Sequence, residues 1–291
     1  MRFVFIRAEK ANFSVFTMCR VLCVSTTGYY AWLKRKPPVR DRNRDELDRK
    51  VTEVYDESRG RYGSPRVFRK LRNSGVRVSE KTVAKIMRNN GQKARTKRRF
   101  KVTTNSKDTK RIAPNLLERE FTVDAPDKVW VTDVTAVWTL VGWVYLAAIL
   151  DLFSRRVVGW AMSDSNDAAL AVAALDRAIL NRKPPRGLIH HSDRGSPYGS
   201  DEYMKALEPI GAIRSMSRKG DCWDNAVPES FFSTLEFECR GEYVFSNLDD
   251  AQCILGDYIE DFYNLERLHS TLGYRSPIEF EISSSLSRKA A

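Results

Sequence analysis

The chain has 291 residues, a formal net charge of +12 and five cysteines. Its length allows two domains of ordinary size. The odd number and irregular spacing of the cysteines exclude a disulfide-stapled secreted domain, and such usage is typical of a reducing compartment. The first ten residues include a run of only four apolar residues, too short for a signal peptide, so we expect a cytoplasmic protein.

Charge divides the chain into two unlike parts. Residues 1–120 contain 32 Lys and Arg against 12 Asp and Glu, whereas residues 121–291 contain 17 against 25. A strongly basic part followed by an acidic part predicts a polyanion-binding module joined to a second module. The alternative is a basic surface that is only solvated. The helical patterns inside the basic part favour a folded module.

Two short helices are predicted near the start, over residues 17–24 and 29–34, with a Ser-Thr-Thr-Gly turn between them. This pattern fits a helix-turn-helix, but it also fits any pair of short packed helices. A basic linker that contains prolines is expected over residues 34–44. A helix is expected over residues 45–58, where apolar residues recur at helical spacing.

A second helical pair is predicted over residues 64–91. Ser64 is expected to cap its first helix with Pro65 in the first turn, and Gly75 to end that helix. Ser79 is expected to cap the second helix, and an Asn-Gly pair to end it. The second helix has apolar residues on one side and basic residues on the other, as in a recognition helix that lies on DNA.

The basic residues of this helix and of the segment after it are the predicted DNA contacts. They are Lys81, Lys85 and Arg88 on the helix and Lys93, Arg95, Lys97, Arg98 and Arg99 in the following arm. Contacts to phosphates need charge rather than a particular fold, so an extended arm serves as well as a helix. The alternative is a small helical domain without a DNA site. The charge of this region favours duplex DNA as its partner.

From Lys128 the apolar pattern changes from helical to strand-like. Three strands are expected in succession, followed by a helix, a strand, a helix, a strand and a last helix. Their ranges are 129–138, 143–153, 155–163, 167–182, 187–191, 200–207, 213–216 and 225–240. This order predicts an α/β fold with three antiparallel strands, further parallel strands and helices on the faces of the sheet.

One uncharged run, residues 134–150, is just long enough for a membrane span. Its β-branched and aromatic residues, with Gly142 in the middle, favour two strands joined by a turn instead. We therefore expect no membrane contact.

Asp133, Asp193 and Glu229 are the candidate catalytic residues. The first two interrupt strand-like runs and the third opens the last helix, with 35 residues between Asp193 and Glu229. Each acid alone fits a role in a turn or at a helix end. Together they would repel one another unless a cation held them, and carboxylate oxygens suit Mg²⁺ or Mn²⁺. A pair of such ions can cut or join phosphodiester bonds.

Other polar residues near these acids have less defined roles. His190 and His191 are expected to pack in the strand and to hydrogen-bond near the site, since neutral imidazole is a soft ligand for Mg²⁺. Arg218 and Lys219 precede the last helix, in a loop that either holds the DNA end or is an ordinary solvated loop.

The segment near the C-terminus is predicted to pack rather than to act. Leu265, Leu268 and Leu272 are expected to dock it on the core. Arg267 and His269 lie among these leucines, and we expect packing rather than DNA contact for both.

Four motifs follow one another along the chain: VWVTDVTAV (129–137), HHSDRGSPY (190–198), SMSRKGDCWDNAVPESFFSTL (215–235) and YNLERLHSTLGYRSP (263–277). In this order and spacing they resemble the DDE transposase and integrase superfamily. More closely, they resemble the second-frame protein, OrfB, of a large family of bacterial insertion sequences. The resemblance covers essentially the whole chain. It implies a ribonuclease-H-like core in which Asp133, Asp193 and Glu229 bind the metal ions.

The resemblance also implies a domain organisation. The expected parts are a helical DNA-binding region with a helix-turn-helix (1–105), a linker (106–125), the catalytic core (126–240) and a helical extension (241–291). The chain departs from the family seven residues after the catalytic Glu. The family commonly has Lys or Arg there and this chain has Glu236, so Arg240, or Arg218 with Lys219, would have to supply the phosphate contact.

These observations predict a transposase that cleaves DNA at the ends of an insertion sequence and joins them to a target, with two Mg²⁺ or Mn²⁺ ions. The resemblance implies a homo-oligomer on DNA, and fusion with or binding to an upstream-frame protein. Two alternatives remain. One is a DNA-binding regulator on an inactive ribonuclease-H-like scaffold, and the other is a nuclease that hydrolyses DNA without joining it.

Overall fold

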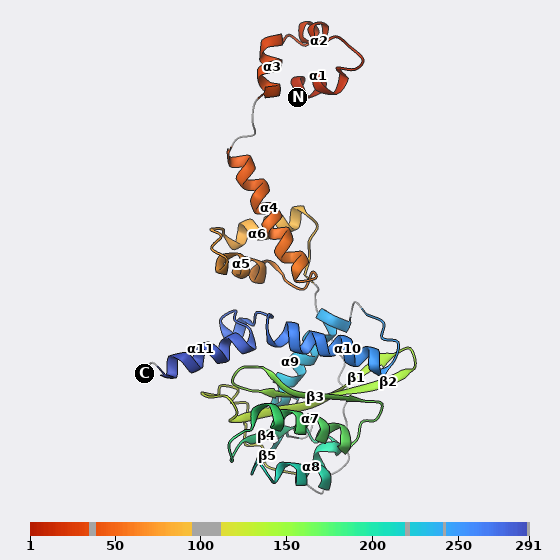
Figure 1. The fold of residues 1–291 in the computed structure, drawn as a ribbon, viewed down its shortest axis with the longest axis vertical. Helices are drawn as coiled ribbons and strands as arrows, with labels where there is room; N and C mark the ends of the chain where they lie inside the picture. The colour runs from red at the N-terminus through yellow and green to blue at the C-terminus, as the bar shows by residue number, and fades with distance from the viewer. Residues whose placement is uncertain (35–38, 95–111, 219–221, 241–242, 290–291) are drawn as a thin grey trace.

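The computed structural model describes residues 1–34, 39–94, 112–218, 222–240 and 243–289 (Figure 1). Helices make up residues 1–94, and a five-stranded sheet with helices on both faces forms the next part. Among the described residues, no helix is long and apolar enough to cross a membrane. The predicted arm residues Arg95, Lys97, Arg98 and Arg99, together with Lys219, lie outside the described residues.

Three short helices form the N-terminal unit: α1 (Arg2–Glu9), α2 (Val15–Val21) and α3 (Thr26–Lys34). Their small core contains Ile6, Met18, Cys19 and Tyr29. The two predicted helices are present, but α3 begins three residues earlier than expected. The reason is that the Ser25 hydroxyl accepts a hydrogen bond from the Gly28 N–H at 2.9 Å and so caps the first turn.

The next helical module consists of α4 (Val39–Glu57), α5 (Ser64–Asn73) and α6 (Glu80–Asn89). Its core includes Val51, Val67, Leu71 and Val83. The expected linker over residues 34–44 is wrong in its second half, because α4 already begins at Val39.

The N-cap residue predicted from the sequence is found in α6 but not in α5. Gly63, not Ser64, is the N-cap of α5, and it offers no side-chain bond. Ser64 is instead the first helical residue, next to Pro65, whose missing N–H does no harm there. Ser79 caps α6 as predicted, because its hydroxyl accepts from the Thr82 N–H at 3.2 Å.

The five strands are β1 (Val129–Thr139), β2 (Gly142–Asp151), β3 (Val157–Ser163), β4 (Ile189–Ser192) and β5 (Ile213–Met216). They lie in the order β3-β2-β1-β4-β5. β1, β2 and β3 pair antiparallel, and β4 and β5 add to β1 in parallel. The fold class predicted from the sequence is therefore confirmed, and β1 lies at the centre of the sheet.

The helices α7 (Ala168–Arg182) and α8 (Asp201–Leu207) cover one face of this sheet, and the short turn η1 (Ser196–Gly199) precedes α8. The Asp167 side chain caps α7 by accepting from the Leu170 N–H at 3.0 Å. Gly159 of β3 lies so close to α7 that a Cβ there would stand 2.6 Å from the Ala178 nitrogen. A glycine at this position thus allows α7 to pack directly on the strands.

The other face is covered by α9 (Ala226–Leu235), which follows the turn η2 (Cys222–Asn225), and by α10 (Leu248–Asp257). The predicted helix over 225–240 is α-helical only to Leu235, and a π-helical turn, η3 (Glu236–Arg240), continues it. Asn225 is the N-cap residue of α9, but its side chain makes no cap bond. Its buried Oδ1 has no partner among the described residues.

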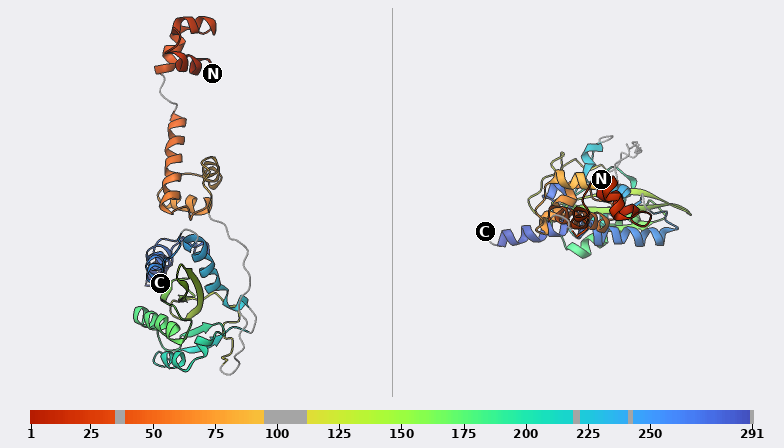
Figure 2. Two further views of the ribbon diagram at one scale, coloured as in Figure 1. Left: turned by 90° about the vertical axis from the view of Figure 1, so that its right-hand side faces the viewer. Right: turned by 90° about the horizontal axis from the view of Figure 1, so that it is seen from above.

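The C-terminal extension continues through η4 (Tyr258–Asn264), η5 (Ser270–Leu272) and α11 (Pro277–Lys289). The prediction for Leu265 is wrong, because this side chain is exposed, whereas Leu272 is buried. Leu268 is buried as well, but in the core of the α4–α6 module. Figures 1 and 2 accordingly show this module against the C-terminal helices.

Candidate active site and nucleic-acid interface

Asp133 and Asp193 lie on neighbouring strands at the centre of the sheet. β1 and β4 run parallel with Thr132 paired to Ser192, so the next residue along each strand is one of the two acids. Neighbouring strands are about 4.8 Å apart. Side chains alternate between the faces of a sheet, so Asp133 projects on the same face as Val131, which packs in the core beneath α9.

Glu229 reaches the same place from α9. The helix packs against β1 through Phe231 and Leu235, which are buried on the same face of the sheet as Val131. Glu229 lies in the first turn of α9 and is exposed. The helix N-terminus favours a carboxylate there.

The three acids act on one another electrostatically. Burial raises the pKa of Asp133 well above its ordinary value, Asp193 raises it further, and Glu229 adds a smaller contribution. Burial also raises the pKa of Asp193. A nearby cation would reverse these effects, because opposite charge stabilises the ionised carboxylate.

The chemistry of this donor set fits a divalent metal. Asp133 Oδ1 accepts from the Val134 N–H and Asp193 Oδ1 from the Gly195 N–H, both at 2.8 Å, which fixes the two carboxylates from one side. Within the part of the chain that the structure describes, however, no group of three or more His, Cys, Asp or Glu side chains is arranged to hold a metal ion. Asp193 and Glu229 thus act electrostatically on Asp133, but the three side chains are not arranged in a metal-coordinating geometry. Because Glu229 is exposed, its side chain is the one with room to turn toward the other two.

A buried aspartate, Asp224, braces the segment before α9. Its carboxylate accepts from the Arg218 backbone N–H at 2.9 Å and from the Arg218 guanidinium at 2.8 and 2.9 Å. Arg119 Nε and Asn115 Nδ2 also donate to it, at 3.2 and 2.9 Å. These bonds, led by Arg218, lower the pKa of Asp224. The brace holds residues 115–119 and Arg218 beside the start of the helix that carries Glu229.

Sequence reasoning did not identify this brace. Asp224 stands inside one of the motifs quoted above, but an Asp before a helix has many roles. Its partner Asn115 is 109 residues away along the chain, so only the fold brings the two together.

Residues 123–222 and 211–277 match models of the integrase core domain, and residues 42–100 match a model of an HTH-like domain. The transposase InsF for insertion sequence IS3A of Escherichia coli (strain K12) is 40% identical over 284 residues, which cover 97% of this chain and 98% of that protein. The chain belongs to the IS3 family of insertion-sequence transposases. The resemblance predicted from the motifs is confirmed.

Other similar proteins cover the chain to different extents. The insertion element IS600 uncharacterized 31 kDa protein of Shigella sonnei is 41% identical over 263 residues, or 90% of this chain and 97% of that protein. Among solved structures, the HTLV-2 integrase catalytic core domain in complex with magnesium is 18% identical with a TM-score of 0.42. It covers 54% of this chain and 97% of that one.

His190 and His191 of this IS3-family chain are both buried and hydrogen-bonded. His190 Nε2 lies 3.0 Å from the Tyr203 hydroxyl, and His191 lies between the hydroxyls of Ser215 and Ser217 at 2.8 and 3.2 Å. Burial lowers the pKa of His190 to about 3 and that of His191 to about 4. Both rings are therefore neutral at pH 7 and hold β4 against its neighbours.

The basic face predicted for the HTH-like domain is present on α6. Lys81, Lys85 and Arg88 are exposed and recur at helical spacing, opposite the buried residues Val83 and Ile86. Lys93, just beyond the helix, is exposed as well. Arg218 is half exposed but directs its guanidinium to Asp224. Their contact with DNA stays a prediction.

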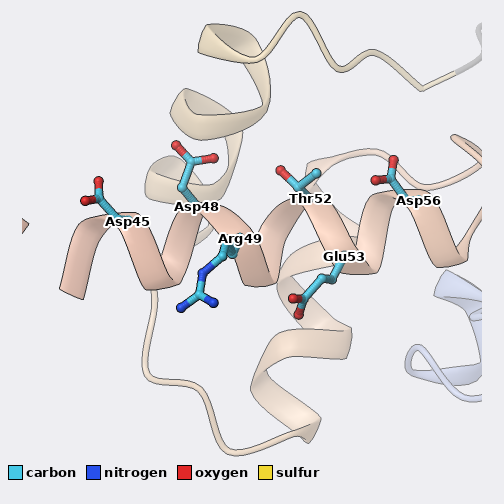
Figure 3. Close-up of a pocket in the computed structure, with 6 residues that line it drawn as sticks. All are labelled: Asp45, Asp48, Arg49, Thr52, Glu53 and Asp56. Carbon is cyan, nitrogen blue, oxygen red and sulfur yellow. The ribbon is translucent and has the colours of Figure 1, made fainter. Parts of the chain in front are cut away.

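The opposite charge gathers on α4 of the same HTH-like domain. Figure 3 shows a pocket along this helix, lined by Asp45, Asp48, Arg49, Thr52, Glu53 and Asp56. Asn90, which caps the end of α6, donates to Asp48 Oδ1 at 2.6 Å. These acidic side chains give α4 a charge opposite to that of the exposed face of α6.

Proposed function

We propose that this IS3-family chain cleaves DNA at the ends of an insertion sequence and joins the ends to a target. The observation that carries the proposal is the mutual influence of Asp133, Asp193 and Glu229, in which two carboxylates raise the pKa of the third. Like charges brought together from β1, β4 and α9 destabilise the fold unless a cation compensates them. Such a cluster is better suited to a site than to a structural role.

Asp133, Asp193 and Glu229 would hold two Mg²⁺ or Mn²⁺ ions. Bound there, the ions would polarise the scissile phosphate, promote deprotonation of the attacking water or 3′-hydroxyl and stabilise the leaving 3′-oxygen. The backbone N–H groups of Val134 and Gly195 fix one oxygen of each aspartate, which leaves the other free to turn toward a ligand. Asp224 and Arg218 keep the start of α9, and with it Glu229, next to the two strands.

The HTH-like domain would bind duplex DNA through α6. Lys81, Lys85 and Arg88 form its exposed basic face, and Lys93 with the arm that follows would add phosphate contacts. The division into residues 1–105, 106–125, 126–240 and 241–291 belongs to this proposal. So do a homo-oligomer on DNA and fusion with or binding to an upstream-frame protein.

A joining assay tests the function. Purified full-length chain, with and without the upstream-frame product, is incubated with a labelled duplex of an element end, a supercoiled target plasmid and Mg²⁺. We expect label joined covalently to the plasmid, and no product in EDTA, because the acids cannot act without the ions. Cleaved ends without joined label would indicate a nuclease. DNA binding without either product would indicate a regulator.

The salt dependence of DNA binding tests the role of α6. Each phosphate that the protein neutralises adds about 0.9 to the slope of log affinity against log salt. The triple substitution of Lys81, Lys85 and Arg88 by Ala should therefore lower the slope by up to about 3 units and weaken binding at low salt. Fluorescence anisotropy at several salt concentrations measures it.

The matched control for this measurement is Lys50→Ala. Lys50 lies on α4 and pairs with Glu46 at 2.6 Å, away from α6. Its slope should equal that of the wild-type chain. An unchanged slope in the triple variant would remove α6 from the interface.

A further inference from the structure

Within the described residues, the HTH-like domain contacts the core through the loop between α4 and α5 and through α5 itself. Residues 59–66 of this loop and the start of α5 meet η3 and residues 266–268 of the C-terminal extension. The left view of Figure 2 shows α4–α6 next to the C-terminal helices. The contact joins the HTH-like domain directly to the helix that carries Glu229, because η3 continues α9.

Glu238 of η3 is the centre of this contact. Its carboxylate accepts from Arg267 Nε and Nη2, both at 2.8 Å, and from the Tyr258 hydroxyl at 2.9 Å. Arg66 of α5 adds an ion pair from the HTH-like domain at 3.4 Å. Glu238 is only 6% exposed, and Arg267 is likewise 6% exposed. One buried carboxylate thus ties together α5, η3 and the C-terminal extension.

A second set of bonds surrounds Glu238. The backbone carbonyl of Glu238 accepts from Arg61 Nε at 2.8 Å, and the guanidinium of Arg61 lies 4.4 Å from the centre of the Phe262 ring. The Tyr62 hydroxyl donates to the Glu266 carbonyl and accepts from the Leu268 N–H, both at 3.1 Å. Arg66 Nε donates to the Leu268 carbonyl at 2.9 Å.

These buried charged groups have their partners only when the HTH-like domain lies in this one position against the core. If the HTH-like domain slid or turned against the core, Glu238 would lose Arg66, and Arg61 would lose its carbonyl and its aromatic faces. A buried charge left without its partner is costly, whereas a surface ion pair is easily exchanged for water. The contact therefore acts as a stiff joint, in contrast to the exposed ion pair of Lys70 with Glu57 within the HTH-like domain.

The joint lies close to the catalytic helix. Glu238 follows Glu229 by nine residues along α9 and η3, or about 13 Å at 1.5 Å per residue. A shift of the HTH-like domain at Glu238 would thus be transmitted to the helix that positions Glu229.

We propose that Arg61, Arg66 and Glu238 are positioning residues that fix the distance along DNA between the segment bound by the HTH-like domain and the phosphodiester that is cut. This inference rests on the proposed function. In this role the three residues determine which phosphodiester is cut, and they affect neither the rate of the chemical step nor the affinity for DNA.

The experiment compares Arg66→Ala, Glu238→Gln and Arg66→Lys with Lys70→Ala in the full-length chain. Lys70→Ala is the matched control, since Lys70 lies on the same helix and pairs only within its own domain in the contacts described above. Hydrogen exchange of the backbone amides of residues 59–66 and 265–269 measures whether the joint is intact, and it does not depend on DNA cleavage. Gel mapping of the cut on an end-labelled duplex of an element end reports the position of cleavage.

We expect faster exchange in both segments for Arg66→Ala and Glu238→Gln, with β1 and β4 unchanged. We expect these variants to spread cleavage over neighbouring phosphodiesters, while the wild type and Lys70→Ala cut at one. Their Kd for the duplex should change less than about threefold, because the phosphate contacts on α6 are kept. Arg66→Lys, which retains the charge, should restore the single position.

Two results would overturn the inference. Unchanged exchange in both Arg66→Ala and Glu238→Gln would show that the joint does not hold the domain. Faster exchange with a single unchanged cleavage position would show that the joint does not set the register. Failure of the wild-type chain to cut the duplex in Mg²⁺, by contrast, would overturn the proposed function and the register with it, and the exchange data would then tell whether the joint itself exists.

Discussion

Asp193→Asn should abolish metal-dependent cleavage of an element end while the chain still folds and binds DNA. An amide keeps the shape of the side chain but loses the charge that holds a cation. A bound metal contributes several kcal/mol to the transition state, so the rate should fall by about a thousandfold or more. Cleavage of labelled duplex in Mg²⁺ measures the rate, and anisotropy on the same duplex measures the binding.

The stability of the same variant without metal gives an independent check. Burial raises the pKa values of Asp133 and Asp193, so the folded chain holds protons that the unfolded chain releases. Stability should therefore fall as the pH rises from the ordinary pKa of Asp, about 4, through the raised values. Asp193→Asn removes one of the two carboxyl groups that cause this loss of stability. Its melting temperature in EDTA at pH 7 should therefore equal or exceed that of the wild type. A lower melting temperature, or undiminished cleavage, would contradict the assignment of Asp193.

Glu229→Gln should abolish cleavage and joining, and Glu236→Gln should not. The two residues are seven positions apart, roughly 10 Å along the helix axis at 1.5 Å per residue, too far for both to be ligands of one pair of ions. Of these two residues, Glu229 is the one that raises the pKa of Asp133, and it lies in the first turn of α9. Glu236 begins the π-helical turn that leads away toward Glu238.

The size of the two effects should differ widely. Glu229→Gln should lower the rate by about a thousandfold or more, for the same reason as Asp193→Asn. Glu236→Gln should change it by roughly twofold, the effect of an ordinary substitution of about 0.5 kcal/mol. Glu236→Lys restores the charge that the family commonly has there, and it should tighten binding and steepen the salt slope by about 0.9. Activity kept in Glu229→Gln but lost in Glu236→Gln would move the third ligand two turns along the helix.

The sequence predicted the sheet well because each strand carries its own signal. Residues 129–138 are rich in β-branched and aromatic residues and residues 213–216 follow a turn at Gly211, and β1 and β5 match these ranges within one residue. The order of strands and helices then left few arrangements, since connections between parallel strands have one hand. Asp133 and Asp193 could be paired in advance for the same reason, since Asp133 lies within one strand of that sheet and Asp193 directly follows another.

What the sequence could not predict are contacts between distant segments. Asn115 reaches Asp224 across 109 residues, and Arg66 reaches Glu238 across 172. Nothing local marks these partners, because a Glu inside a helix is ordinary until a fold buries it. The prediction for Leu265 was wrong for a related reason. The spacing of Leu265 and Leu268 fits one buried helix face, but Leu265 is exposed and Leu268 packs into the core of the HTH-like domain.

The pairing of β1 with β4 joins residues that are sixty positions apart, so the candidate site forms late during synthesis. Residues 39–94 leave the ribosome before the sheet does, and α4, α5 and α6 share a core among themselves. Asp193 emerges about a hundred residues later, and Glu229 and Leu268 later still. On the proposed function, a growing chain thus carries the surface proposed to bind DNA before it carries the residues proposed to cut it. A translation product that stops short of α9 would keep α6 and lack Glu229.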